Sequence, residues 1–247
     1  MIEVHQLYKS FGKLKVLRGA DLTLHDGEAL TILGKSGAGK SVLIKAIIGL
    51  IEPDAGQIII DGIDVTDFSE ETFNERVRPY ISFVFQGGAL WDSMTVGANI
   101  NLALQIQKHL DERERKTRIQ ESLRLVDLRG IENIYPEELS GGMLKRASIA
   151  RAIATRPKYM LYDEPTTGLD PPLANVINDL IIRLNGELGT TSLIISHDIA
   201  GTQKISNRVA LLRDGKLVLT CETKDMWNQE NDIFNEFING KVMCNEG

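Results

Sequence analysis

Two glycine-containing segments of this 247-residue chain have residue types that suit the binding of phosphate groups. Gly34–Ser41 reads GKSGAGKS and fits the pattern G-x-x-x-x-G-K-[ST]. Its glycines let backbone N–H groups wrap phosphate oxygens, Lys40 can reach the β- and γ-phosphates, and Ser41 can coordinate Mg²⁺. Leu139–Met143 reads LSGGM and opens a predicted helix, where backbone N–H groups and the helix dipole favour an anion. A chain of this size therefore carries two candidate phosphate-binding segments, which needs an explanation.

Polar side chains also follow predicted buried strands. The apolar stretch YMLY leads into Asp163 and Glu164, so Asp163 is placed to hold Mg²⁺, directly or through water, and Glu164 to take a proton from an attacking water. His197 follows the strand SLIIS and is a candidate contact of the γ-phosphate. Gln86 follows SFVF in the same way. Each of these residues taken alone is also explained as an ordinary strand-end residue.

The elements around these residues predict an α/β fold. EALTIL is β-prone and runs into the glycine loop, and Ser41–Leu50 has helical periodicity that stops before Pro53, so together they form half of a βαβ unit. Aspartate–glycine pairs between apolar or alternating segments are a strong hairpin signal, and they occur at Asp26-Gly27, Asp61-Gly62 and Asp214-Gly215.

Two segments are predicted to be helical. The charges in residues 87–150 are spaced three or four apart, which indicates a helical insert. Its run DERERKTR is interpreted as a solvated helix face, with a nucleic-acid contact as the less favoured alternative. The tail over residues 222–247 carries an apolar stripe that packs either on its own domain or on a partner, and the stripe consists of Trp227, Ile233, Phe234, Phe237 and Ile238.

The composition is that of a globular protein in a reducing compartment. The chain is 43% hydrophobic and 25% charged, and its net charge of -6 argues against a protein whose main task is to grip nucleic acid. Its two cysteines, Cys221 and Cys244, do not form a disulfide framework or a zinc site. The start, MIEVHQLYKS, lacks a signal-peptide pattern, and the longest apolar runs are too short to span a bilayer, so we expect a cytosolic protein.

Taken together and in this order, GKSGAGKS, Gln86, LSGGM, YMLYDE, Gly168-Leu169-Asp170 and His197 resemble the ATP-binding subunits of ABC transporters. The resemblance spans nearly the whole chain. It implies one domain over residues 1–247 with a P-loop NTPase (RecA-like) mixed sheet, an N-terminal antiparallel portion and the helical insert. It also explains the second segment, because in this family two copies face head to tail and each ATP lies between GKSGAGKS of one copy and LSGGM of the other.

The resemblance also implies a role for each site residue. Phe11 is the aromatic that stacks on adenine, although a core position for Phe11 and a competing role for Tyr8 stay open. The catalytic residues are Glu164 as general base, His197 and Gln86. The metal ligands are Ser41, Gln86 and Asp163. The residues that bind ATP are Phe11, Gly34, Lys35, Ser36, Gly37, Ala38, Gly39, Lys40, Ser41, Val42, Ser140, Gly141, Gly142 and Asp170.

Some stretches resemble a narrower group, the ATPases of MCE-type lipid systems such as the Mla and Mkl-like transporters. Val42 stands where most of the family has Thr, and the other stretches are FQGGALWDSMTV, YPEELSGGM, EPTTGLDP and NDIFNEFINGK. This likeness implies a phospholipid cargo, an inner-membrane location on the cytoplasmic face, an MCE protein and a STAS-domain subunit as partners. The membrane permease would dock near Gln86–Met94, where an apolar cluster could instead form a small subdomain core.

Three other functions remain open at this point. The chain could serve an importer of a small solute, or be a soluble ABC ATPase that acts on ribosomes or DNA. The latter proteins usually carry two ATP domains or a long coiled-coil insert, and neither is visible here. A P-loop kinase would leave LSGGM unexplained.

Overall fold

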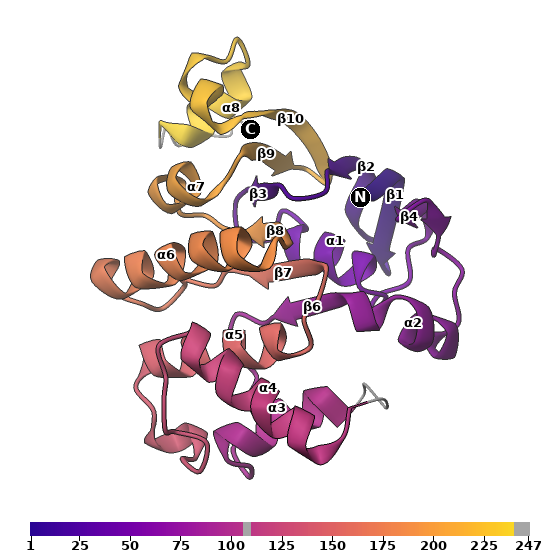
Figure 1. The fold of residues 1–247 in the computed structure, drawn as a ribbon. Helices are drawn as coiled ribbons and strands as arrows, with labels where there is room; N and C mark the ends of the chain where they lie inside the picture. The colour runs from indigo at the N-terminus through magenta and orange to yellow at the C-terminus, as the bar shows by residue number, and fades with distance from the viewer. Residues whose placement is uncertain (106–109, 240–247) are drawn as a thin grey trace. The chain divides into compact units, whose positions relative to one another are not determined.

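The computed structural model describes residues 1–105 and 110–239 (Figure 1). The chain forms two compact units: residues 1–68 together with the chain from Leu193 onward make the first unit, and residues 69–192 make the second. The assignment of residues 1–247 to one domain stays a prediction. The parts of the helical insert at 106–109 and of the tail at 240–247, including Cys244, lie outside the described residues.

The first unit contains the predicted antiparallel portion. Four strands form a sheet in the order β2-β1-β4-β5, and their bounds are β1 (Ile2–Phe11), β2 (Leu14–Leu24), β4 (Ala55–Ile60) and β5 (Ile63–Asp64). Ile2 lies between Leu24 on β2 and Ile60 on β4. All three side chains are buried. Alternate residues of β1, such as Ile2 and Val4, point into the core, as the period of two in a strand requires.

The same unit holds the strand that leads into the phosphate loop. β3 (Ala29–Leu33) is buried throughout and pairs in parallel with β9 (Arg208–Arg213). The strand order continues as β10-β9-β3-β8, where β10 (Lys216–Glu222) is antiparallel to β9. β8 (Thr191–Ile195) is buried throughout like β3, which suits strands covered on both faces. The remaining helical elements of this unit are α1 (Lys40–Ile47), α7 (Ile199–Ile205), η3 (Thr223–Asn228) and α8 (Asp232–Ile238).

Two of the predicted hairpins are confirmed and one is wrong. Asp61-Gly62 joins β4 to β5, and Asp214-Gly215 joins β9 to β10. In both pairs the Asp and the Gly have positive φ angles, as a type I′ turn requires. At Asp26-Gly27 only the glycine has a positive φ, so the turn does not fold β3 back onto β2. Instead β2 and β3 belong to different sheets.

The second unit combines a pair of strands with most of the helices. β6 and β7 pair in parallel, with Ile81 opposite Tyr159. Figure 1 shows α3, α4 and α5 gathered in one part of this unit, within the segment predicted as the helical insert. The bounds are α2 (Glu70–Arg76), η1 (Arg78–Tyr80), β6 (Ile81–Val84), α3 (Val96–Gln105), α4 (Glu112–Leu125), η2 (Pro136–Glu138), α5 (Gly141–Ala154), β7 (Tyr159–Asp163) and α6 (Pro171–Leu188).

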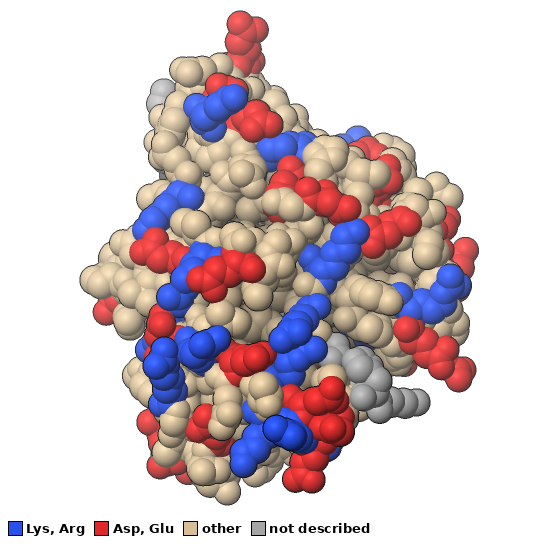
Figure 2. Space-filling model, viewed as in Figure 1, with Lys and Arg blue, Asp and Glu red and all other residues tan. Residues whose placement is uncertain are grey.

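The charged run DERERKTR begins α4, and its interpretation as a solvated helix face is confirmed. Asp111 and Glu114 form a capping box at the start of this helix. Most side chains of the run are exposed. On the face drawn in Figure 2, basic and acidic side chains are interspersed rather than segregated. The absence of a nucleic-acid partner stays a prediction.

The apolar stripe of the tail packs in part on its own unit. Phe234 and Ile238 are buried in a cluster with Leu33, Val209 and Leu211, so the first of the two interpretations is confirmed for them. The other members differ, because the side chains of Trp227 and Ile233 are 45% and 37% exposed. Within residues 1–105 and 110–239, no helix combines the length and the apolar character that crossing a bilayer needs.

Candidate nucleotide-binding site

The phosphate loop is closed by its own lysine. β3 ends at Leu33, the loop runs over Gly34–Gly39, and α1 begins at Lys40. Nζ of Lys40 donates hydrogen bonds to the carbonyl oxygens of Gly34 at 2.7 Å and of Lys35 at 3.0 Å. These bonds hold the buried ammonium group over the loop, where it can meet the oxygens of a polyphosphate.

The start of α1 has the features of an anion site. Its N-cap is Gly39 in a left-handed conformation, with φ 103°, and no side chain in the described part of the chain caps the helix. Serine, aspartate or asparagine side chains cap α2, α4, α5, α6, α7 and α8. A β-carbon at Gly39 would come within 3.1 Å of Val16, so the backbone lies close against β2. The loop therefore fits the phosphates of a nucleotide, with the helix start as one of its contacts.

Gly34 is required by a close approach of two backbones. A β-carbon at this position would lie 2.5 Å from the carbonyl oxygen of Leu212 on β9. We expect Gly34→Ala to lower the free energy of unfolding by about 1–3 kcal/mol, because the backbone must shift to relieve the overlap. Thermal unfolding measures this change, and nucleotide binding should weaken with it.

Gly186→Ala is the matched control for Gly34→Ala. Gly186 lies inside α6, and a β-carbon there would meet no atom within 4 Å. Alanine should leave the stability unchanged or raise it by up to about 1 kcal/mol, because glycine weakens a helix interior. Equal stability of the two variants would show that the approach to Leu212 has no energetic consequence.

In the second unit, the structure brings Gln86 and Glu164 together. Nε2 of Gln86 lies 3.4 Å from Oε2 of Glu164, and the same oxygen accepts a hydrogen bond from Oγ1 of Thr167 at 2.8 Å. Glu164 also has a positive φ of 49°, which is uncommon for a residue other than glycine. Strained backbone of this kind is frequent at functional sites, and here it sets the direction of the carboxylate directly after β7.

Two basic residues hold the loop that carries Gln86, and the sequence interpretation missed both. Nζ of Lys145 donates to the carbonyl oxygen of Gln86, and Arg151 donates to those of Ala89 at 2.6 Å and Gly88 at 3.2 Å. Burial lowers the pKa of the Lys145 ammonium, while the charge of Glu164 acts in the opposite direction. A lysine and an arginine among the apolar positions of a predicted helix were the available signal.

The signature segment lies at the start of α5. Oγ of Ser140 caps this helix by accepting from the backbone N–H of Met143 at 3.3 Å, while Gly141 is exposed. Gly142 is buried, and a β-carbon there would come within 3.2 Å of Leu173 on α6. Asp170 caps α6 by accepting from the N–H of Leu173 at 2.9 Å. Ser140 and Asp170 thus each have a structural role in addition to the role that the sequence predicts.

The other predicted site residues lie at strand ends or in the first turn of α1. Phe11 ends β1, and its side chain is 50% exposed, so the alternative that it is a core residue is wrong. Tyr8 is 41% exposed and remains a competing candidate. Val42 is half-buried in α1, and His197 is exposed directly after β8. Their roles toward nucleotide stay predictions.

The segment predicted as the permease docking site is an exposed loop. Trp91 is 60% exposed and Ala89 is exposed, whereas Leu90 and Met94 are half-buried, so the cluster does not form a subdomain core. The buried Asn99 holds the loop by accepting from the N–H of Trp91 at 2.7 Å and donating to its carbonyl oxygen at 3.0 Å.

The predicted magnesium ligands have suitable chemistry. Mg²⁺ prefers oxygen donors, and Ser41, Gln86 and Asp163 offer a hydroxyl, an amide oxygen and a carboxylate. Because Nε2 of Gln86 faces Glu164, Oε1 is the atom left for the metal. Mg²⁺ bound with ATP neutralises charge on the β- and γ-phosphates.

A buried strand, the GKSGAGKS loop closed by Lys40, and the helix that follows define a P-loop nucleoside triphosphatase. The chain belongs to the ABC transporter family, whose model matches residues 17–167. It is the ATP-hydrolysing subunit of an ABC transporter, and its cofactors are ATP and Mg²⁺.

Curated relatives with different stated cargoes resemble the chain. It is 36% identical over 245 residues to an Fe(3+) ions import ATP-binding protein of Mannheimia succiniciproducens, covering 96% of this chain and 68% of that protein. It is 37% identical to a probable ribonucleotide transport ATP-binding protein, mkl, of Mycobacterium bovis, covering 97% and 67%. It is 36% identical to a glycine betaine transport ATP-binding protein of Bacillus subtilis, covering 94% and 56%.

Solved structures share the fold. A dimeric ATP-binding cassette in a post-hydrolysis state, bound to ADP and Pi, superposes with a TM-score of 0.83 at 31% identity, covering 90% of this chain and 99% of that one. A cassette of Clostridium perfringens that is part of an ABC transporter complex superposes with a TM-score of 0.84 at 27% identity, covering 98% and 95%. The predicted P-loop NTPase fold is confirmed.

Proposed function

We propose that this ATPase works as a head-to-tail pair of identical chains on the cytoplasmic face of an inner membrane, where it drives a permease that moves phospholipid. The dimeric form of the similar cassette supports the pairing. The single observation that carries the lipid cargo is the resemblance of several stretches, including FQGGALWDSMTV, to the ATPases of MCE-type systems. In that stretch, the exposed Trp91 lies where the permease would dock.

The composite site explains why one chain has two phosphate-binding segments. ATP held by Gly34–Val42 of one copy would be completed by Ser140, Gly141 and Gly142 of the second, with Asp170 near the interface. ATP then binds the closed pair better than the open one, so it shifts the population toward closure. Hydrolysis, with Glu164 as the general base and His197 near the γ-phosphate, removes that preference.

Ser140→Arg tests the composite site. The bulky cation should block the approach of the partner's γ-phosphate, so we expect ATP turnover to fall at least about 100-fold, the loss typical for a removed charge-stabilising contact. The loss of the helix cap alone should lower the free energy of unfolding by about 0.5–2 kcal/mol. Steady-state ATPase assays and thermal unfolding separate the two effects.

Ser69→Arg is the matched control, because Ser69 is also an exposed serine that caps a helix, with its Oγ accepting from the N–H of Thr72 at 3.2 Å. It should lose similar stability and keep its turnover. Normal activity of Ser140→Arg would mean that LSGGM serves only as a helix cap.

The cargo is tested by what accompanies the assembled transporter. The tagged chain, purified from detergent-solubilised membranes of its own organism, should bring down a permease, an MCE protein and phospholipid, identified by mass spectrometry. A STAS-domain subunit in the same fraction would extend the likeness.

The second candidate is an importer of a small solute, which is favoured by relatives named for Fe(3+) ions and glycine betaine. A solute-binding protein in the purified complex, with no MCE protein, would replace the lipid assignment with this one. Association with ribosomes or DNA that persists at moderate salt would contradict both.

A further inference from the structure

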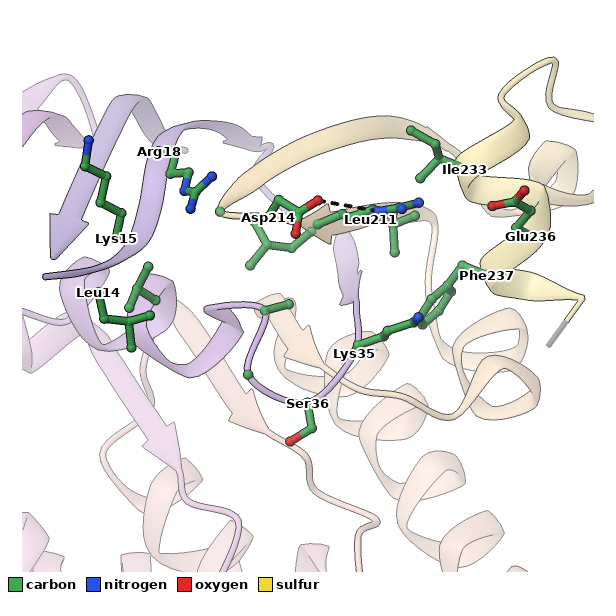
Figure 3. Close-up of a pocket in the computed structure, with 16 residues that line it drawn as sticks. Leu14, Lys15, Arg18, Lys35, Ser36, Leu211, Asp214, Ile233, Glu236 and Phe237 are labelled. Atoms are coloured by element: carbon green, nitrogen blue, oxygen red, sulfur yellow. Dashed lines mark ion pairs between the residues drawn. The ribbon is translucent and has the colours of Figure 1, made fainter. Parts of the chain in front are cut away.

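A cavity of about 470 Å³ lies beside the phosphate loop in the first unit (Figure 3). Its walls come from segments far apart in the sequence: Lys35–Ala38 of the loop, the start of β2, the turn at Asp214-Gly215, and α8. The α8 residues are Ile233, Glu236 and Phe237. None of the roles assigned above uses these three side chains.

The position of α8 is set by its opposite face. Phe234 and Ile238, four residues apart, are 0% and 5% exposed in the cluster that includes Leu33, the residue before Gly34. Asn231 caps the helix by accepting from the N–H of Phe234 at 2.9 Å. With one face buried and the start capped, the helix presents the neighbouring face to the cavity at a fixed angle.

The cavity lies where a nucleoside would extend from the phosphate loop. Phe11, the predicted adenine contact, pairs with Leu14 at the end of the β1–β2 ladder, and both Leu14 and Val16 line the cavity. Ser36, Gly37 and Ala38 line it from the loop. A nucleotide with its phosphates on the loop and its base near Phe11 would therefore run along the wall that faces α8.

The charges of the lining suit an anion at one end. Lys15, Arg18, Lys35 and Arg213 line the cavity, and Arg213 lies 3.6 Å from Asp214 in an ion pair. In Figure 3, Lys35 extends from the loop in the direction of Phe237 on α8. Glu236 is the acid contributed by α8, and an ionised carboxylate can only accept hydrogen bonds, so it matches the donor groups of a nucleoside and not a phosphate.

We propose that α8 forms the outer wall of the nucleoside half of the ATP site. Phe237 and Ile233 contact the base or ribose, and Glu236 accepts a hydrogen bond from a nucleoside hydroxyl or amino group. The C-terminal helix then contributes to affinity for the nucleoside and to selection of its donor groups. This inference rests on the proposed position of ATP on Gly34–Val42.

The alternative is that α8 only braces the phosphate loop through Leu33. The two explanations differ in what they predict for a ligand that lacks the nucleoside. ADP and inorganic pyrophosphate share two linked phosphates, and neither requires hydrolysis. A residue that contacts the nucleoside affects ADP alone, whereas a residue that shapes the loop affects both ligands.

The experiment measures binding of ADP and of pyrophosphate by isothermal titration calorimetry, with Mg²⁺, to the full chain and to Phe237→Ala. We expect the dissociation constant for ADP to rise about tenfold, the size of a lost aromatic contact, and that for pyrophosphate to stay within about twofold. Equal weakening of both ligands, or no weakening of either, would overturn the proposal for Phe237.

Additional variants keep the test decisive. Phe237 also packs on the buried cluster, so Phe237→Leu, which retains most of the volume, replaces the alanine variant if that variant unfolds. Glu236→Gln should weaken ADP about threefold and leave pyrophosphate unchanged or tighter, since one hydrogen bond to a charge is weakened. Tightening of both ligands by the same factor would show that Glu236 acts only through its charge and would refute its contact.

Two controls separate this inference from the proposed function. Trp227→Ala removes an aromatic that is 45% exposed on the neighbouring η3 and does not line the cavity, so it should change neither affinity. Lys40→Ala should weaken both ligands. If wild-type protein bound ADP and pyrophosphate and Lys40→Ala bound them equally well, the assignment of the phosphate site would fail, whatever the result for Phe237.

Discussion

Lys40→Ala is expected to abolish ATP turnover. The ammonium group is buried and held by the carbonyl oxygens of Gly34 and Lys35, so its position above the loop is set before nucleotide arrives. Removal of a preorganised positive charge from the developing charge of a phosphoryl transfer typically costs about 10²–10³ in kcat, and we expect at least that loss. Steady-state phosphate release measures it.

Lys45→Ala is the control for this variant, because Lys45 lies in the last turn of the same helix and outside the loop. It should keep wild-type turnover. Unchanged ATPase activity of Lys40→Ala would refute the role assigned to this lysine.

The same variant gives a test of pairing when it is mixed with Ser140→Arg. In a mixed pair, the intact GKSGAGKS of the Ser140→Arg copy faces the intact LSGGM of the Lys40→Ala copy, so one complete site forms. We expect the mixture to recover activity that neither variant has alone. A mixture as inactive as its components, with mixed pairs demonstrated by differential tags, would contradict the head-to-tail arrangement.

Glu164→Gln is expected to bind ATP, stall and accumulate as a dimer. The amide keeps the shape of the carboxylate and its contact with Thr167, which donates from its hydroxyl at 2.8 Å, but it cannot accept a proton from water. Loss of a general base typically lowers kcat by about 10²–10⁴. Size-exclusion chromatography with ATP, and again with ADP, should show a dimer only with ATP.

Glu187→Gln, an exposed glutamate of α6, is the control and should behave like the wild type. A Glu164→Gln protein that stays monomeric with ATP would count against the composite site. Wild-type turnover of that variant would refute the role of Glu164 as the base.

Local chemistry in the sequence was enough to predict much of the fold and the identity of the phosphate loop. The pattern at Gly34–Ser41 specifies its own backbone, because a glycine-rich turn between a buried strand and a helix has few alternatives. The pairs Asp61-Gly62 and Asp214-Gly215 likewise specify tight hairpins. Asp26-Gly27 has the same letters and a different result, because the flanking strands find their partners in separate sheets.

The supporting residues could not be predicted, because they act on segments far away in the chain. Lys145 and Arg151 hold the loop after β6 by hydrogen bonds to backbone carbonyls, which any sequence provides and which therefore leave no pattern. The positive φ of Glu164 similarly depends on the packing around the end of β7.

The sequence by itself determined the family, the ATPase chemistry and the order of the elements, since these depend on residue types at short spacing. The tertiary structure decided that α8 lines a cavity beside the phosphate loop, that Phe11 is half exposed, and that Ser140 and Asp170 also cap helices. The physical reason is that exposure and long-range contact result from the packing of elements whose separation in the chain is large, and periodicity within one element carries no information about its neighbours.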